Sequence, residues 1–251
     1  MDKKMISDHI ENWQCCDIAQ LVNHFHFMEK DKSGDLQQMR LGALVLEGEA
    51  LSLLKSDSLK SLTLHMALTK KEAVNGEATF APILEVCKEG GLEGSATFKP
   101  YSSDAPYSGL VPGVFKEAVN RNWLLIDSTL VDDLFLAYKP TEKNQIPQLQ
   151  RLLRYHISKK TNTLLFDVLT MKGVQDNLKA IDLYMGADMN KLDDKGAFTF
   201  TPVIVLRTKK LDDETLLAIA KKGLRSFGGL TDDDDDEVLF EYLKPCPSTC
   251  N

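Results

Sequence analysis

Two segments of the chain show the alternation of apolar and other residues that predicts β-strands. Apolar residues occupy every second position from 62 to 66, and they do so again from 181 to 185. A period of two places successive side chains on opposite faces, so one face of each strand is expected to be buried. The two segments lie about 120 residues apart, which suggests an internal repeat.

Each of these strands is followed by a polar stretch and a second apolar segment, which together predict a β-hairpin. The polar stretches end in Asn75-Gly76 and Lys195-Gly196, and glycine suits the tight return of a hairpin. The segments 76–86 and 196–206 then share Gly, Thr, Phe and Pro in the same order and spacing. Since proline cannot donate to a strand ladder, the two prolines are expected at an unpaired side or a bulge.

Helical patterns precede each hairpin. The first follows Asn12-Trp13 in one copy and Asn122-Trp123 in the other, and a second is expected around 39–54 and around 146–169. Acidic residues at 212–214 also open a predicted helix, because negative charge suits the first turn. A last strand is expected over 238–243.

These elements predict an α+β fold with two tandem copies of a helix-helix-β-hairpin unit, mostly antiparallel sheets and helices packed on one face. The predicted organisation is a first unit over 1–100, a linker over 101–113, and a second unit over 114–251 with an extra helix, strand and cysteine-containing tail. The paired hairpins can form one sheet or two domains, and the short linker favours close packing.

Composition narrows the classes of partner. The 251 residues are 43% hydrophobic and 27% charged, and they carry a net charge of −7. This charge repels phosphate backbones and anionic membranes, so neither nucleic acid nor a membrane is expected as a partner. Because the apolar runs are too short for a membrane span and no signal peptide is evident, the expected location is cytoplasmic.

The cysteines carry the most distinctive candidate chemistry. Cys246 and Cys250 flank a Pro-Ser-Thr tripeptide, and such a pair can form a small disulfide, bind a soft metal or act in redox chemistry. Zinc needs four ligands in a closed site, so a complete set of cysteine ligands would have to come from both ends of the chain. The candidate zinc ligands are Cys246, Cys250, Cys15 and Cys16. The competing interpretation is a flexible tail with inert thiols.

Other polar features favour structural roles. His24 and His26 can add to the cysteine set, but helix through Phe25 would place the two imidazoles on different faces, as ordinary surface or half-buried histidines. The acidic run 232–236 lacks the spacing of a calcium loop and is expected to be a solvated loop. Cys87 and His65 can meet across the first hairpin, although packing is the favoured role of Cys87. No nucleotide-binding or hydrolase motif is present in the sequence.

The hairpin and tail together resemble a set of uncharacterised proteins common in Bacteroidetes. The resemblance covers most of residues 36–86 and 148–206, and the tail Cys246-Pro-Ser-Thr-Cys250 has Ser where that set has a second Pro. It implies kinship of fold and no chemistry. We therefore expect a non-enzymatic binding or scaffold module for a protein or small ligand, using a concave face or sheet edge. The alternative is a metal-binding or redox protein that uses the C-terminal cysteine pair.

Overall fold

The computed structural model describes most of the chain. The described residues are 2–31, 33–56, 58–73, 76–100, 114–127, 131, 133–139, 148–160, 162–187, 200–222, 226–228, 235–240 and 245–246. Several predicted features lie outside them. These are the linker 101–113, Asn75 and the turn at 195–196, residues 232–234 of the acidic run, and Cys250.

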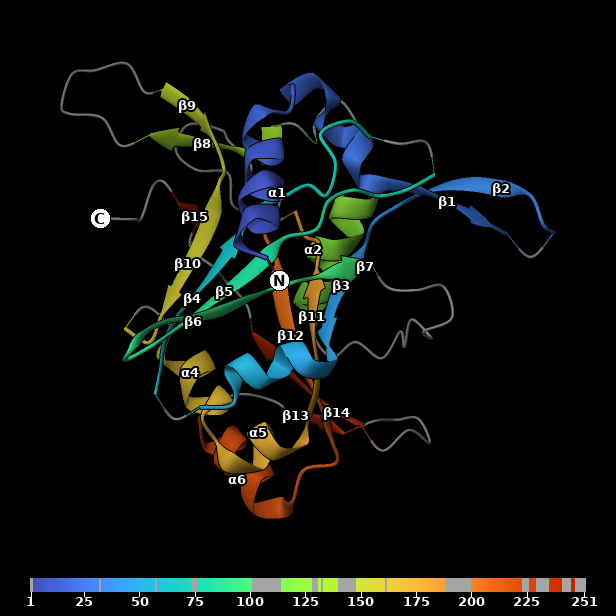
Figure 1. Ribbon diagram of the computed structural model, residues 1–251. Helices are drawn as coiled ribbons and strands as arrows, with labels where there is room; N and C mark the ends of the chain where they lie inside the picture. The colour runs from blue at the N-terminus through green and yellow to red at the C-terminus, as the bar shows by residue number, and fades with distance from the viewer. Residues whose placement is uncertain are drawn as a thin grey trace.

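Helices and antiparallel sheets make up the fold (Figure 1). The helices are α1 (Lys3–Cys15), η1 (Ile18–Phe25), η2 (Gly48–Leu54), α2 (Val114–Leu125), α4 (Thr163–Leu169), α5 (Lys172–Asn177) and α6 (Asp213–Lys221). The strands are β1 (His26–Lys30), β2 (Leu36–Arg40), β3 (Ala43–Glu47), β4 (Leu59–His65), β5 (Ile83–Lys88), β6 (Gly91–Thr97), β7 (Lys99–Pro100), β8 (Leu136–Lys139), β9 (Gln148–Arg151), β10 (Arg154–Ser158), β11 (Leu178–Tyr184), β12 (Val203–Lys209), β13 (Ser226–Gly228), β14 (Asp235–Phe240) and β15 (Pro245–Cys246). The predicted α+β class is confirmed.

Two large sheets each combine strands from both halves of the chain. One sheet has the order β15-β10-β4-β5-β6 and the other the order β13-β14-β12-β11-β3-β7. Strand β10 pairs with β4, whereas β3 pairs with β11. The two halves therefore exchange a strand, and neither sheet is complete without the other half.

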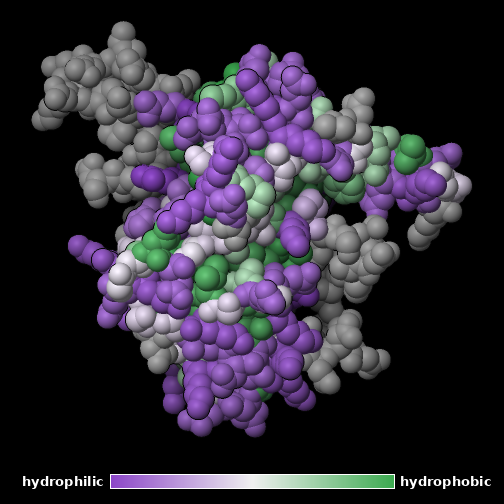
Figure 2. All heavy atoms as spheres, in the orientation of Figure 1, coloured by the Kyte–Doolittle hydropathy of each residue, from purple (hydrophilic) through white to green (hydrophobic). Residues whose placement is uncertain are grey.

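The two smaller hairpins project from the body. Strands β1 and β2 form one, β8 and β9 form the other, and Figure 1 shows them on opposite sides of the molecule. Figure 2 shows a largely hydrophilic face with apolar atoms on the β1–β2 hairpin. The exposed fractions there are 62% for Leu36 and 41% for both Met28 and Met39.

The strands of the predicted hairpins are β4–β5 and β11–β12, which pair antiparallel. Their second strands begin later than predicted, directly after Pro82 and Pro202. Phe80 and Phe200, two residues before these prolines, form isolated bridges with Leu68 and Ala187. Each proline thus precedes a ladder that it could not have joined as a donor.

The predicted second helices are largely wrong. Residues 36–40 and 43–47 are strands, and only 48–54 forms a short 3₁₀ helix. In the other half, strands β9 and β10 precede the helix α4. The run 43–46 is buried at every position, and a short continuous apolar run does not distinguish a buried strand from a helix.

The C-terminal elements are close to prediction. Helix α6 begins after Asp212, whose carboxylate accepts a 2.6 Å hydrogen bond from the backbone N–H of Thr215. Such an N-cap satisfies a donor that the helix cannot pair. Strand β14 starts at Asp235, so the last part of the acidic run belongs to a strand and not to a loop. Its predicted range of 238–243 therefore begins too late.

An aromatic cluster joins the halves at the centre of the core. Its six rings belong to Trp13, Phe25, Phe80, Trp123, Phe135 and Phe200, all 0–1% exposed. The rings of Phe25 and Phe135 stack with centroids 5.1 Å apart and planes at 6°. Phe25 also meets Trp123 edge-on, and Phe135 meets Trp13 in the same way. The two edge-on contacts match each other, because each joins a phenylalanine of one half to the tryptophan of the other half.

Candidate functional site

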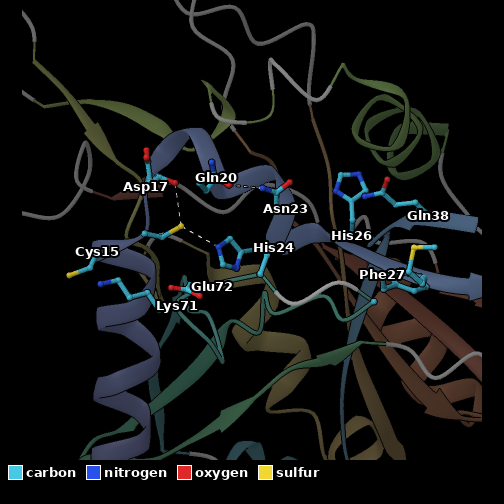
Figure 3. Close-up of a pocket in the computed structure, with 14 residues that line it drawn as sticks. Cys15, Asp17, Gln20, Asn23, His24, His26, Phe27, Gln38, Lys71 and Glu72 are labelled. Atoms are coloured by element: carbon cyan, nitrogen blue, oxygen red, sulfur yellow. Dashed lines mark hydrogen bonds between the residues drawn. The ribbon is translucent and has the colours of Figure 1, made fainter.

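A cavity of about 830 Å³ lies beside the C-terminal end of α1. Its walls come from the end of α1, from η1, from the β1–β2 hairpin and from residues 71–73 and 76. Figure 3 draws the side chains that line it. The volume falls within the range of small-molecule sites in proteins.

Cys16 and His24 meet in this cavity. The Sγ of Cys16 lies 3.2 Å from His24 Nε2, and His24 Nδ1 lies 2.5 Å from Thr79 Oγ1. Cys16 Sγ also lies 3.3 Å from the backbone oxygen of Asp17. Cys16 is 6% exposed and both His24 and Thr79 are 1% exposed. The three side chains therefore form a buried line from thiol to imidazole to hydroxyl.

Local structure explains how these residues meet. Helix α1 ends at Cys15, and the side chain of Asp17 then caps the 3₁₀ helix η1 by accepting from Ala19 N–H at 3.1 Å. The tight 3₁₀ turn carries the chain back so that His24 faces the end of α1. The backbone N–H of Thr79 donates to the His24 carbonyl at 3.0 Å. This bond holds Thr79 beside the ring.

The protonation of His24 follows from its surroundings. Burial lowers the pKa of His24 below its usual value of 6.5, and the nearby positive charge of Arg151 lowers it further. The imidazole is therefore neutral at pH 7. With the proton on Nδ1, the ring donates to Thr79 Oγ1 and presents the Nε2 lone pair to the Cys16 thiol.

In the other half, aliphatic residues stand at the two backbone positions that correspond to Cys16 and His24. Cys16 N–H donates to Asn12 O at 3.0 Å, and Ile126 N–H donates to Asn122 O at 2.8 Å. Phe80 N–H donates to His24 O at 3.2 Å, and Phe200 N–H donates to Leu134 O at 2.8 Å. By backbone position, Ile126 corresponds to Cys16 and Leu134 corresponds to His24. The polar pair is specific to one half.

The predicted zinc ligands are distributed over two parts of the fold. Cys15 and Cys16 line the cavity, where Cys15 is exposed and Cys16 is buried. Cys246 is in β15, paired with Arg154 at the edge of the five-stranded sheet, and Cys250 lies outside the described residues. Within the described residues, no group of three or more His, Cys, Asp and Glu side chains could hold a metal ion. The four-cysteine set stays a prediction.

The other predicted histidine and cysteine roles have different outcomes. His24 is buried rather than on the surface or half-buried, whereas His26 is half-buried and lines the cavity. Cys87 pairs in register with Ser61, while His65 pairs with Ile83 at the other end of the hairpin. Cys87 and His65 therefore do not meet. Sequence reasoning missed the Cys16–His24 pair, although both residues were among the candidate ligands.

Comparison with known proteins leaves the site to be interpreted from its geometry. No family model, curated protein or solved structure matches the chain. No described helix has the length and apolar character needed to cross a membrane. The suggested kinship with the Bacteroidetes set stays an expectation.

Proposed function

We propose that this protein is a binding module for a small organic ligand and that the cavity beside Cys16 and His24 is its binding site. The observation that supports the proposal most directly is a cavity of about 830 Å³ that combines apolar and polar walls. Phe27 and Met28 supply apolar surface, and the side chains of Gln20, Asn23 and Gln38 supply uncharged hydrogen-bonding groups. Such a mixture is typical of sites for small molecules. A cytoplasmic location, where thiols stay reduced, belongs to the same proposal.

A thermal-shift screen with matched variants tests this proposal. The probes are a panel of small carboxylic acids, amines, amides and esters. Ala73 lines the cavity, so Ala73→Trp should fill it, whereas Ala19 is exposed on η1 outside the cavity lining and Ala19→Trp is the control. We expect at least one probe to stabilise the wild type and Ala19→Trp, but not Ala73→Trp. Stabilisation that survives Ala73→Trp would place the binding site elsewhere.

We also propose that the chain is an internal duplication of a unit larger than the predicted one. The supporting observations are matched contacts at equivalent places in both halves. Trp13 Nε1 donates to Leu152 O at 2.8 Å, and Trp123 Nε1 donates to Leu41 O at 2.7 Å. In this interpretation the repeated unit contains a helix, a projecting hairpin, an exchanged strand and a paired hairpin. Duplication would leave one copy free to acquire the polar site while the other kept an aliphatic core.

Metal binding is a second candidate function, because a thiol and an imidazole already lie 3.2 Å apart. Both are ligands that zinc prefers. The remaining ligands would come from Cys15 and the tail cysteines Cys246 and Cys250. Metal analysis of protein purified without chelators, together with the Cys246→Ser and Cys250→Ser variants, tests this. Stoichiometric zinc that both variants lose would support it, and metal-free protein with freely titrating thiols would exclude it.

A further inference from the structure

We propose that Cys16 is a nucleophile, that His24 is its general base, and that the ligand of the cavity is an ester or thioester whose acyl group is transferred to Cys16. The inference rests on the proposed function, because the acyl compound must first occupy the cavity. The 3.2 Å between Cys16 Sγ and His24 Nε2 is suitable for proton transfer, and both side chains line the cavity. A nucleophile beside a base that a third group orients is the arrangement used in covalent catalysis. Thr79 is that third group.

The polar pair is not needed to build the fold. At the equivalent backbone positions, Leu134 is buried in the core and Ile126 is a partly buried side chain packed against it. Burying polar groups costs free energy unless they are hydrogen-bonded, so an aliphatic pair is the simpler solution for a core. The presence of a thiol and an imidazole in one half alone therefore points to chemistry at that place.

The charges around the cavity favour an uncharged acyl compound over a phosphate ester. Among the described lining residues, Asp17 and Glu72 contribute carboxylates and Lys71 contributes a lysine. Together with the net charge of −7, this surface disfavours a doubly negative phosphate group. The carboxamide of Asn23 donates to Gln20 Oε1 at 2.8 Å, so the amide nitrogen of Gln20 is the neutral hydrogen-bond donor for an acyl oxygen. Gln20 and Asn23 belong to η1, as does His24 (Figure 3).

The reaction needs only the acyl compound and water. The Cys16 thiol proton moves to His24 Nε2 as the sulfur forms a bond to the acyl carbon. The bond from that carbon to the leaving oxygen or sulfur then breaks, and His24 returns the proton to the leaving group. A thioester on Cys16 results. Water, deprotonated by His24, attacks this thioester, so the C–S bond breaks and the thiol is restored together with a free carboxylic acid.

The first test measures the reactivity of each cysteine. Iodoacetamide is added near pH 7, and peptide mass spectrometry follows each site. Cys15 is an internal control, because it is exposed and points away from His24 in Figure 3. We expect Cys16 to react about ten-fold faster than Cys15 despite its burial, since an adjacent base raises thiolate character. His24→Leu, which copies the residue of the other half, should lower the Cys16 rate to that of Cys15 or below. A slow Cys16 in the wild type, or no effect of His24→Leu, would overturn the proposal.

The second test uses p-nitrophenyl acetate and a simple acetyl thioester as probes. We expect a burst of p-nitrophenolate and one acetyl group on Cys16, followed by slower turnover. Cys16→Ile should abolish both, Cys87→Ser should change neither, and His24→Leu should lower the acylation rate by about 100-fold. Cavity ligands found in the thermal-shift screen with no acetyl group on Cys16 would overturn the acyl proposal alone. If no probe stabilises the cavity in the thermal-shift screen and no acetyl group forms on Cys16, the proposed function is overturned as well.

Discussion

The indole of Trp13 donates a hydrogen bond of 2.8 Å from Nε1 to the carbonyl oxygen of Leu152, which lies 139 residues later in the chain. The reciprocal bond, from Trp123 Nε1 to Leu41 O, is 2.7 Å long. Each carbonyl lies just before an exchanged strand, because Leu41 precedes β3 and Leu152 precedes β10. The tryptophans thus fix the entry of each half's strand into the other half's sheet.

Replacing either tryptophan by phenylalanine should destabilise the protein to a similar degree. Each change removes the indole donor and leaves a buried carbonyl without that bond, which costs about 1–3 kcal/mol. Urea unfolding followed by circular dichroism measures the effect in Trp13→Phe and Trp123→Phe. A large loss in one variant and none in the other would contradict the equivalence of the two bonds.

The strand exchange predicts that the halves depend on each other for folding. Residues 1–106 and 107–251, expressed as separate chains, should each fail to show cooperative unfolding, since β4 would lack β10 and β11 would lack β3. Mixing the two fragments should restore the native circular dichroism spectrum and give a 1:1 complex by size-exclusion chromatography. Cooperative unfolding of either fragment alone would show that its sheet does not need the exchanged strand.

The pKa of His24 predicts a pH dependence of stability. Burial lowers that pKa below 6.5, and the charge of Arg151 adds to the effect. The unfolded chain therefore takes up a proton near pH 6.5 more readily than the folded protein does, so the His24 contribution is complete above that pH and is lost as the pH falls below it. Burial also lowers the pKa values of His26 and His65. The pH dependence of the wild-type stability is therefore the sum of the contributions of these histidines and His24.

The His24→Leu variant isolates one part of this pH dependence. Its free energy of unfolding should fall less than that of the wild type between about pH 7.5 and about pH 5.5. Leu21→Ala is the control, because it removes a buried side chain without removing a titratable group and should leave the slope unchanged. Equal slopes in the wild type and His24→Leu would show that His24 does not contribute.

The sequence predicted the parts of the fold that have a clear local signal. The period of two over β4 and β11 predicted both strands, and Asp212 predicted the start of α6. Strand β3 has no such signal, because its residues from Ala43 to Leu46 are all buried. In β10, Tyr155 and Ile157 are buried while their neighbours are more exposed, so the helix predicted around 146–169 is wrong at this place.

The candidate site was harder to predict for a different reason. Cys16 and His24 are eight positions apart, Cys16 directly after α1 and His24 near the end of the 3₁₀ helix η1, and the turn between the two helices brings them together. Thr79 comes from 55 residues further on and depends on the packing of the whole half. The spacing of these three residues in the sequence does not predict that their side chains meet. The polar pair stands out only by comparison with the aliphatic residues Ile126 and Leu134 of the other half. That comparison depends on the backbone correspondence between the halves, which the structure provides.

An ion pair between Arg207 and the buried Asp182 supports the six-stranded sheet and allows a matched test. Arg207 donates to both carboxylate oxygens of Asp182, at 2.7 and 3.0 Å, and the Asp182 side chain is 1% exposed. Arg207→Met removes the bidentate cation from a buried carboxylate and should cost about 3–5 kcal/mol of unfolding free energy. Asp167→Asn weakens the pair of Asp167 with Lys222, whose side chains are 30% and 35% exposed, and should cost about 1 kcal/mol or less. Urea unfolding of both variants measures the difference. Equal losses would mean that burial of Asp182 adds nothing to the pair, because solvent would then screen both pairs alike.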